Sequence, residues 1–237
     1  MKTQNSVVFV TGANRGFGLS LAREALARGA SKVYAGMRNT AGFNVPGIVP
    51  VQLDVTDPAS IAAAVARCGD VTVLVNNAGI GRVLEGPLDS RMEAQSREIF
   101  ETNYYGIIRA TQAFAPILGK NGGGAIINVL SIVSWIPSQV LAAYAASKAA
   151  SWSYTNTVRL ELQKQGTQVL GVHVGFMDTD LTKGVDAPKV SPADVARQTF
   201  DDMEAGKNEV LGDEVTRAVK AGLSAEKASY FDGSGLL

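Results

Sequence analysis

Short apolar runs alternate with longer stretches of helical pattern along most of the chain. The runs are rich in Val, Ile and Leu and have no polar face, which is typical of strands buried on both sides of a parallel sheet. The predicted strands are Val7–Val10, Lys32–Ala35, Ile48–Leu53, Val71–Val75, Ala125–Val129 and Val169–Val174, with Glu209–Leu211 as a candidate last strand.

The stretches between these runs have the length and spacing of helices. They are Gly16–Arg28, Pro58–Arg67, Glu93–Leu118, Leu141–Gln165 and a helix that opens at Ser191-Pro192 and runs toward Gly206. Asp57-Pro58 has the form of an N-cap followed by proline at the first helical position. The alternation of strand and helix predicts right-handed crossovers with helices on both faces of the sheet, a doubly wound, Rossmann-type α/β fold.

Length and composition suit one domain. The chain has 237 residues, of which 46% are apolar and 19% charged, as in an ordinary globular protein with a full core. It contains no internal repeat and no Pro/Gly-rich linker. We therefore expect a single domain over residues 1–237, with a short loop near 176–191 that contributes to a substrate site.

The charge balance and the cysteine count exclude several classes of protein. Lys plus Arg and Asp plus Glu both number 22, so no net field attracts nucleic acid or an anionic membrane. The only cysteine, Cys68, cannot form an internal disulfide, and together with the only histidine, His173, it leaves too few ligands for a zinc site. The sequence has no signal-peptide pattern and no apolar run long enough to span a bilayer. We expect a cytoplasmic protein with no metal and no nucleic-acid or membrane partner.

A glycine-rich loop follows the first predicted strand and leads directly into a helix. It reads Thr11-Gly12-Ala13-Asn14-Arg15-Gly16-Phe17-Gly18. Glycines let the backbone turn tightly and approach a pyrophosphate, and the helix N-terminus offers free N–H groups. The alternative is an ordinary tight turn, since glycine serves there as well. The strand before the loop and the helix after it favour phosphate binding.

The end of the second predicted strand bears on the choice between NAD and NADP. An acidic residue there would bind the ribose 2′-hydroxyl, but the sequence reads Ala35-Gly36-Met37-Arg38. Arg38 and Arg15 together would form a two-armed clamp for a 2′-phosphate. The alternative is that both arginines are solvated surface residues. We predict NADP(H) as the cofactor.

Two further polar groups stand at the carboxyl ends of predicted strands, the edge at which open parallel sheets bind ligands. Asp54 follows the third strand and is a candidate acceptor for the adenine amino group; alternatively, it only forms a turn with Thr56 and Asp57. Asn76-Asn77-Ala78-Gly79 closes the fourth strand.

Tyr144 and Lys148 are four positions apart, so they share one face of a predicted helix, and Ser131 follows the fifth strand. With a pKa near 10, tyrosine is a weak acid–base group at neutral pH. An ammonium about 4 Å away would stabilise tyrosinate by roughly 4 kcal/mol and bring the pKa of Tyr144 toward the operating pH. Ser131 would orient the substrate oxygen. Alternatively, Tyr144 and Lys148 are ordinary residues of an amphipathic helix.

Taken in order, these signals resemble the compact, single-domain branch of the short-chain dehydrogenase/reductase family. The resemblance implies a dinucleotide-binding catalytic domain with a seven-stranded parallel sheet of order 3-2-1-4-5-6-7. It implies Tyr144 as the acid–base, Ser131 as the orienter of the carbonyl, and Lys148 as a partner of the nicotinamide ribose. Asn103 would be a fourth catalytic residue, in a helix that opens slightly and holds a water for proton relay; without the resemblance, a mid-helix asparagine is interpreted as a polar surface residue. The matching positions are Thr11–Gly18, Asp54, Asn76–Gly79, Asn103, Ser131, Tyr144 and Lys148.

The resemblance also implies which residues contact the cofactor. Basic residues at Arg15 and Arg38 are similar to those of NADP-preferring carbonyl reductases. Gly175 follows Val174 where the family usually has Pro-Gly; it would still permit close approach of the nicotinamide, and Thr179 would bind the carboxamide. The full predicted set is Gly12, Asn14, Arg15, Gly16, Phe17, Gly18, Arg38, Asp54, Val55, Asn77, Ala78, Gly79, Tyr144, Lys148, Gly175, Met177 and Thr179.

Apolar residues dominate the segments expected to form the substrate pocket. They are Ile132, Val133, Trp135, Pro137, Val140, Phe176 and Leu181. No charged anchor for a carboxylate or phosphate is evident, so we expect a lipophilic ketone or aldehyde that is interconverted with its alcohol. For any one of these residues the alternative is a place in the core.

Two other functions stay open at this point. A catalytically silent NADP-binding scaffold or redox sensor would share the fold but would not need Tyr144 as a proton donor. An epimerase or dehydratase of the same family usually carries a longer substrate domain than this chain has room for. The resemblance further implies a homodimer or homotetramer built on Glu93–Leu118 and Leu141–Gln165.

Overall fold

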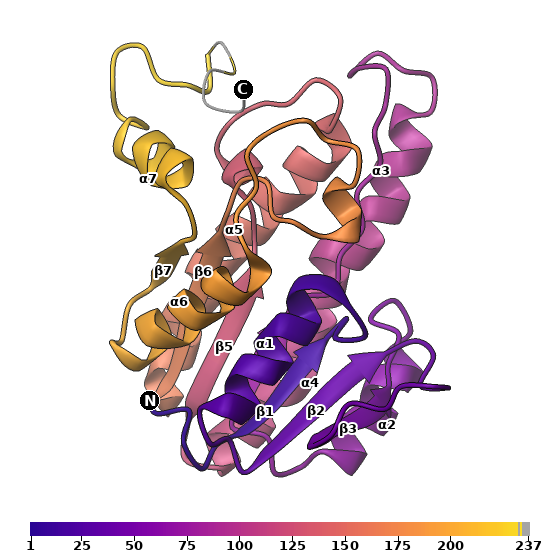
Figure 1. Cartoon of the computed structure of the whole chain (residues 1–237), viewed down its shortest axis with the longest axis vertical. Coiled ribbons are helices and arrows are strands. Elements are labelled where there is room, and N and C mark those ends of the chain that lie inside the picture. The colour runs from indigo at the N-terminus through magenta and orange to yellow at the C-terminus, as the bar shows by residue number, and fades with distance from the viewer. Residues whose placement is uncertain (232, 234–237) are drawn as a thin grey trace.

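The computed structural model describes residues 1–231 and 233 and contains one parallel sheet of seven strands (Figure 1). The strand order is β3-β2-β1-β4-β5-β6-β7, which confirms the predicted fold class and topology. From β1 to β3 successive strands are added on one side of β1, and from β4 onward they are added on its other side. Doubly wound folds bind their ligands at this switch point between β1 and β4. The strands are β1 (Val7–Thr11), β2 (Lys32–Met37), β3 (Ile48–Gln52), β4 (Val73–Asn76), β5 (Gly124–Val129), β6 (Thr167–His173) and β7 (Glu209–Leu211).

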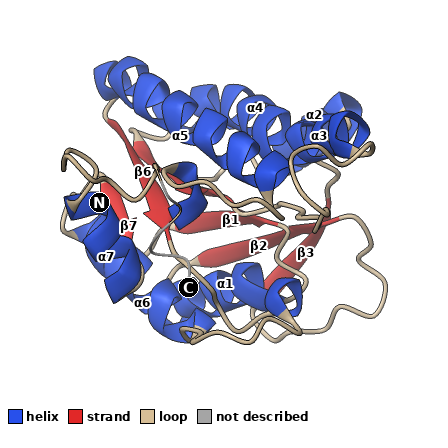
Figure 2. Ribbon diagram, turned by 90° about the horizontal axis from the view of Figure 1, so that it is seen from above, coloured by secondary structure: helices blue, strands red, loops and turns tan. Residues whose placement is uncertain are grey.

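Helices cover both faces of the sheet, as Figure 2 shows from above. One layer contains α1 (Gly16–Ala27) and α6 (Pro192–Glu204); the other contains α2 (Pro58–Arg67), α4 (Gly106–Lys120) and α5 (Ala142–Leu162). Successive residues of β1 serve the two layers in turn. Val8 and Val10 pack in the cluster that holds Phe200, whereas Phe9 faces the other way and its ring centroid lies 4.9 Å from that of Phe114. The apolar runs of the sequence are therefore buried on both faces.

The prediction of one continuous α-helix over Glu93–Leu118 is wrong, because the helix changes type in its middle. The structure divides it into α3 (Met92–Phe100), a π-helical segment (Glu101–Tyr105) and α4. Short π-helical segments cluster at functional sites, because the wider turn redirects side chains. A further helix, α7 (Glu214–Ala221), was not predicted, since eight residues are too few for a clear periodic pattern.

Loops that follow the strands gather at the upper end of the molecule in Figure 1. The loop after β6 is compact there: Asp178 N donates to Val190 O at 3.0 Å, Val190 N donates to Phe176 O at 2.9 Å, and a 3-10 turn forms at Asp180–Thr182. None of the helices within residues 1–231 is long and apolar enough to cross a membrane.

Candidate active site

The four predicted catalytic residues come together at the upper end of the sheet. Ser131 follows β5, Tyr144 and Lys148 lie on α5, and Asn103 lies in the π-helical segment. The Ser131 hydroxyl lies close enough to the Tyr144 phenol to lower its pKa slightly, and Lys148 Nζ lies 5.5 Å from the centroid of the Tyr144 ring. Asn103 Nδ2 donates to Ser147 Oγ at 3.1 Å, which brings it against the same helix.

Ser131 has extended backbone and caps a short 3-10 turn at Ile132–Ser134. Its hydroxyl accepts from Val133 N at 3.4 Å and donates to Val174 O at 3.4 Å. Both distances are long for hydrogen bonds that involve a hydroxyl. The hydroxyl is therefore held in place but weakly bound, and it can turn toward a substrate oxygen.

The environment of Tyr144 differs from the one expected from its spacing to Lys148. Burial raises the pKa of Tyr144 to about 12, and contact with Ser131 only partly offsets this. Burial also lowers the pKa of Lys148 to about 8, while its Nζ donates to Val129 O at 2.7 Å. The expected lowering of the Tyr144 pKa is wrong for this state, because desolvation outweighs a lysine turned toward a backbone carbonyl. Tyr144 is thus a protonated phenol at neutral pH, the form that a carbonyl reduction requires.

Asn103 is fully buried, so its interpretation as a polar surface residue is wrong. Its Oδ1 accepts from Ile80 N at 2.8 Å, and its Nδ2 donates to Ile80 O at 2.9 Å. The backbone carbonyl of Asn103 accepts from Ser151 Oγ at 3.1 Å. The helix opens at this residue, as the resemblance implied, and the side chain ties the loop after β4 to the catalytic helix.

Close backbone packing shapes the glycine-rich loop. A Cβ on Gly12, which has φ +67°, would lie 2.9 Å from Ala78 Cα, and one on Gly18 would be blocked by Gly12 O. Asn77 Nδ2 donates to Thr11 O at 2.9 Å and to Gly12 O at 3.1 Å. Asn77 therefore holds the loop in shape instead of offering its amide to a ligand. Thr11 completes this brace, since its Oγ1 accepts from the backbone N–H groups of Asn77 and Ala78 at 3.0 Å.

Replacing Gly18 by Ala is expected to reduce dinucleotide affinity by at least about 100-fold, because the added methyl group displaces the loop. Titration of the purified variant with the reduced dinucleotide, followed by fluorescence, measures this. Gly42→Ala is the matched control, since a Cβ at Gly42 meets no atom within 4 Å, although its φ of +73° adds some strain. Wild-type affinity in Gly18→Ala would contradict the role assigned to the loop.

The residues around this loop fit the diphosphate of a dinucleotide. Among the described residues no side chain caps α1, whereas Asp57, Ser191 and Asp213 cap α2, α6 and α7. Uncapped N–H groups and the positive end of the helix dipole favour an anion. A cavity of about 540 Å³ opens beside them, lined by Arg15, Gly16, Asp178, Thr179, Asp180, Lys183, Gly184 and Lys189. Of the predicted cofactor residues, Asn14 is exposed in the loop, and Phe17 and Met177 are buried beneath it.

The predicted arginine clamp is not assembled. Arg38 is exposed just after β2, close enough to Asp54 to help lower the pKa of that carboxyl, although hydrogen bonding from the Thr56 backbone is the larger cause. Arg15 points elsewhere: its Nη1 lies 2.8 Å from Asp180 Oδ2. Because this ion pair is exposed, it is worth little and opens readily. Of the two arginines, Arg38 is the one that lies beside Asp54 at the end of the sheet strands.

Asp54 also forms the turn that the sequence left open, since its Oδ1 accepts from Thr56 N at 2.9 Å. Val55 packs against the start of α4: a Cβ added to Gly106 would lie 2.9 Å from Val55 Cγ2. At the end of β4, Gly79 lies against Asn103, whose Oδ1 would be 3.3 Å from an added Cβ.

Gly175 has a partner that the sequence did not reveal. Its N–H donates to Asp213 Oδ2 at 2.6 Å, while Asp213 Oδ1 accepts from Thr216 N at 2.6 Å. Asp213 therefore caps α7 and anchors the loop after β6 with the same carboxylate. The only sequence signal was an acidic residue before a short helix, which indicates a cap but not its second contact.

The predicted substrate pocket is corrected in part. Ile132, Val133 and Trp135 are buried in a core cluster with Ile136, Ala145 and Val219, so they do not line an open pocket. Val140 and Leu181 do reach the surface, with 46% and 59% of their area exposed, and Phe176 is half-buried. A Cβ added to Gly81 would lie 3.5 Å from Leu181 Cδ1 and 3.6 Å from Tyr144 Cδ2. Gly81 and Leu181 therefore flank the phenol at the mouth of the site.

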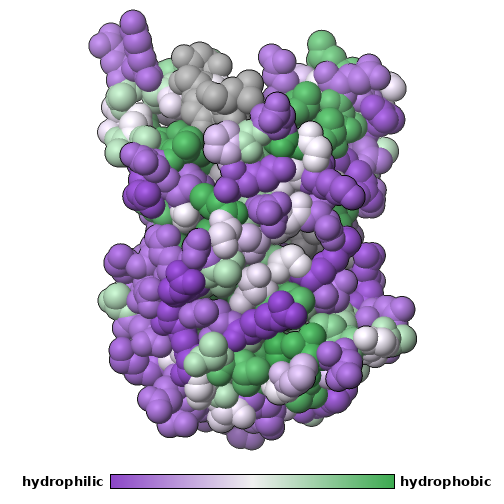
Figure 3. Space-filling model, viewed as in Figure 1, coloured by the Kyte–Doolittle hydropathy of each residue, from purple (hydrophilic) through white to green (hydrophobic). Residues whose placement is uncertain are grey.

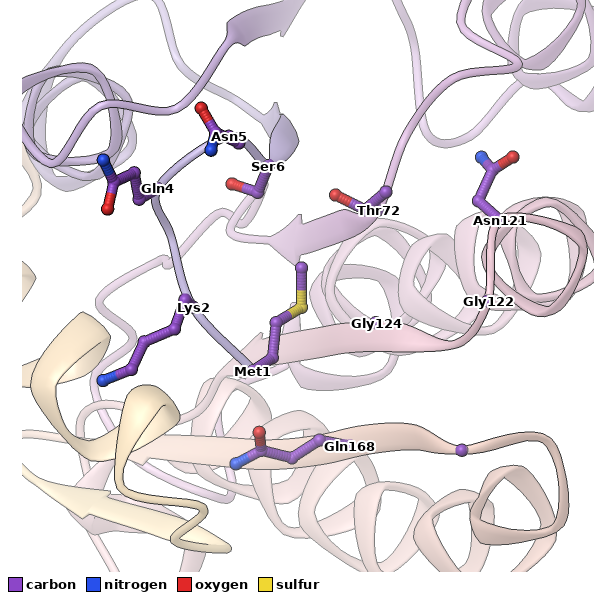
Figure 4. Close-up of a pocket in the computed structure, with 11 residues that line it drawn as sticks. Met1, Lys2, Gln4, Asn5, Ser6, Thr72, Asn121, Gly122, Gly124 and Gln168 are labelled. Carbon is purple, nitrogen blue, oxygen red and sulfur yellow. The ribbon is translucent and has the colours of Figure 1, made fainter.

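A second hollow lies at the opposite end of the sheet (Figure 4). Its volume is about 460 Å³, and it is lined mostly by polar residues that precede or begin the strands, among them Ser6, Thr72 and Gln168. It is remote from the catalytic residues. Within the described part of the chain, no three His, Cys, Asp or Glu side chains are grouped to hold a metal ion.

Comparison with known proteins agrees with this geometry. A family model for short chain dehydrogenases matches residues 6–189. The chain belongs to the short-chain dehydrogenase family. It is 31% identical over 247 residues to the 3-oxoacyl acyl-carrier-protein reductase FabG of Salmonella typhimurium, which covers 100% of this chain and 96% of that one.

Solved structures of other short-chain dehydrogenases share the architecture. One from Burkholderia cenocepacia in complex with NADP has a TM-score of 0.91 and 36% identity, with 96% of each chain covered. A 3-ketoacyl acyl-carrier-protein reductase from Brucella melitensis complexed with NADH has a TM-score of 0.78 and 25% identity, over 88% of this chain and 96% of that one. A nicotinamide dinucleotide is accordingly the cofactor type of this short-chain dehydrogenase.

Proposed function

We propose that this chain is an NADP(H)-dependent oxidoreductase that interconverts a lipophilic ketone or aldehyde and its alcohol. The observation that carries this proposal is the protonated Tyr144 phenol beside the Ser131 hydroxyl, next to a glycine-rich loop suited to a dinucleotide. The bound cofactor supplies or accepts the hydride.

The chain's own residues move the proton. Ser131 donates a hydrogen bond to the substrate oxygen, and Tyr144 gives that oxygen a proton as its negative charge develops. Lys148 has a pKa lowered to about 8, so near neutral pH it is mainly an ammonium and stabilises the tyrosinate that forms. In the direction of alcohol oxidation, the same tyrosinate takes the proton back.

The preference for NADP rests on the adenosine end of the site. Arg38 stands where an NAD-specific site would carry an acidic residue, and its guanidinium suits a 2′-phosphate. The relative from Burkholderia cenocepacia, at 36% identity, is bound to NADP. The relative complexed with NADH is more distant, at 25% identity.

The mouth of the site supports a lipophilic substrate. Val140 and Leu181 are exposed there, and Val83, in the neighbouring loop, is 73% exposed. Leu84 N donates to Val140 O at 2.9 Å, which joins this loop to the segment before α5. Figure 3 shows apolar side chains among hydrophilic ones at the upper end of the molecule. A short hydrocarbon or aryl group would cover this surface favourably.

An assay with NADPH or NADH and a panel of carbonyl compounds tests the function. Aryl ketones, 3-oxoacyl esters and sugar lactones represent the lipophilic class, the acyl class of the FabG relative and a polar class. We expect oxidation of NADPH with the first two and little with the third. If no carbonyl oxidises NADPH or NADH and no alcohol reduces NADP+ or NAD+, the catalytically silent scaffold is favoured instead.

Assembly as a homodimer or homotetramer stays a prediction, as does a single catalytic domain over residues 1–237. Tyr105, in the π-helical segment, and Leu160 on α5 support an assembly surface, since they are 46% and 70% exposed on the two predicted interface helices.

A further inference from the structure

A cluster of polar and aromatic side chains lies behind the loop that carries Ser131. At its centre is His173, the last residue of β6, which is fully buried. Glu209 of β7 and Lys220 of α7 lie beside it, and Trp135 covers its ring. None of these residues takes part in the proton transfer described above, so their arrangement needs its own explanation.

His173 contacts the backbone of the serine directly. Its Nδ1 lies 3.1 Å from Ser131 O, which can only accept a hydrogen bond. Its Nε2 lies 3.8 Å from Glu209 Oε1 and has no hydrogen-bond partner within the part of the chain that the structure describes. Burial lowers the pKa of His173 to about 4, so the neutral ring carries one proton at ordinary pH. The distances place that proton on Nδ1.

The surroundings keep the imidazole in this orientation and this state. The ring of Trp135 stacks on it with centroids 3.9 Å apart and planes 20° apart. The charged groups that face His173 come from three elements: Glu209 favours its protonation, whereas Lys220 and Lys148 oppose it. Lys220 Nζ binds Glu209 Oε1 at 2.9 Å and so neutralises much of the effect of that carboxylate.

The contact bears on the position of the Ser131 hydroxyl. Ser131 O also accepts from Ser134 N at 3.0 Å, and Ile132 N donates to Val174 O at 3.0 Å. These two bonds hold the residues after the serine, whereas the hydroxyl itself makes only long hydrogen bonds. The imidazole donor is the one side-chain contact, among those described, that clamps the serine's own carbonyl to β6.

We propose that His173 is a positioning residue of the active site: as the Nδ1-protonated tautomer it holds Ser131 so that the serine hydroxyl faces the substrate oxygen. This role rests on the proposed carbonyl chemistry. A misplacement of about 1 Å at a reacting group can cost about 100-fold in rate, so a clamp on the serine backbone has a measurable kinetic effect.

The tautomer is open to direct observation because the chain contains one histidine. Long-range proton–nitrogen NMR correlations on the labelled wild-type protein report which ring nitrogen carries the proton. We expect a protonated Nδ1 and a bare Nε2 at neutral pH, independent of any turnover. A proton on Nε2 would overturn the proposal, since Ser131 O would then face a lone pair.

A pair of variants tests the kinetic role. His173→Asn places an amide nitrogen near the position of Nδ1 and restores the donor, whereas His173→Leu fills similar space without one. With the carbonyl that the wild type reduces best, His173→Leu should lower kcat at least about tenfold, and His173→Asn should recover most of the loss. The NADPH Kd should stay unchanged in both.

Thermal unfolding of the same variants separates positioning from a core-filling role. A side chain that only fills the core would lower the melting temperature of His173→Leu and leave kcat per folded molecule unchanged, and that result would refute the proposal. A wild-type protein without turnover on any carbonyl would refute the proposed function itself, and the positioning role with it. Turnover that is equal in wild type and His173→Leu refutes the positioning role alone.

Discussion

Tyr144→Phe is expected to lower kcat for carbonyl reduction by about 10²–10⁴-fold, the usual contribution of a positioned proton donor. The phenol beside Ser131 is protonated at neutral pH, and burial, which raises its pKa to about 12, holds it in that form. Phenylalanine keeps the ring, and with it the packing against the core cluster of Ile132 and Trp135, but removes the hydroxyl proton. Steady-state kinetics with the best substrate of the panel measure the effect.

Tyr154→Phe is the matched control for this change, since Tyr154 lies on the same helix and the substitution also removes a single hydroxyl. It should keep kcat near the wild-type value, and both variants should bind NADPH as the wild type does. Undiminished turnover in Tyr144→Phe would mean that the proton comes from another group, and the assignment of Tyr144 would have to be abandoned.

Arg38→Asp is expected to weaken NADPH binding relative to NADH by about 100-fold or more. Hydrogen bonds to a charged group contribute about 1.5–3 kcal/mol each, which corresponds to roughly 10–150-fold in affinity. The new carboxylate would also repel the 2′-phosphate and offer an acceptor to the ribose 2′-hydroxyl of NADH. Fluorescence titration of each dinucleotide gives the ratio of the two Kd values.

Arg23→Asp is the control for net charge. Arg23 is exposed on α1, so this variant has the same change of charge at a position away from the end of β2. It should leave the ratio of Kd values unaltered. An unaltered ratio in Arg38→Asp would remove the electrostatic reason for preferring NADP. If Arg15→Ala then lowered NADPH affinity, Arg15 would have to leave Asp180 to reach the phosphate.

Several features of the site follow from neighbouring residues alone. Whether a run of residues is buried on both faces depends on its own composition, so the seven strands could be predicted with ends that shift by a few residues. The glycine-rich loop is a local signal too, because its glycines permit turns and close backbone contacts within the loop and with the adjoining strand ends. The spacing of Tyr144 and Lys148 places both on one helical face without further information.

Other features depend on groups distant in the sequence. The helix opens at Asn103, where the side chain forms hydrogen bonds with the backbone of Ile80. Arg15 pairs with Asp180 instead of joining Arg38, because the loop after β6 brings Asp180 next to it. Trp135 was predicted to line the substrate pocket because it is a large apolar side chain after the fifth strand, yet its ring is stacked on His173 in the core. No spacing rule predicts these contacts, since each joins separate elements.

The sequence by itself determined the parallel α/β fold, the glycine-rich loop after the first strand and the shared helical face of Tyr144 and Lys148, since periodicity and short spacings encode local geometry. The prediction of Asn103 as a fourth catalytic residue came only from the family resemblance. Only the tertiary structure decided their electrostatic state and their support. The pKa of Tyr144 depends on how much water the folded chain removes from around the phenol, and the orientation of Ser131 depends on an imidazole that reaches it from β6. Desolvation and long-range hydrogen bonds are properties of packing, and packing exists only once the distant parts of the chain have met.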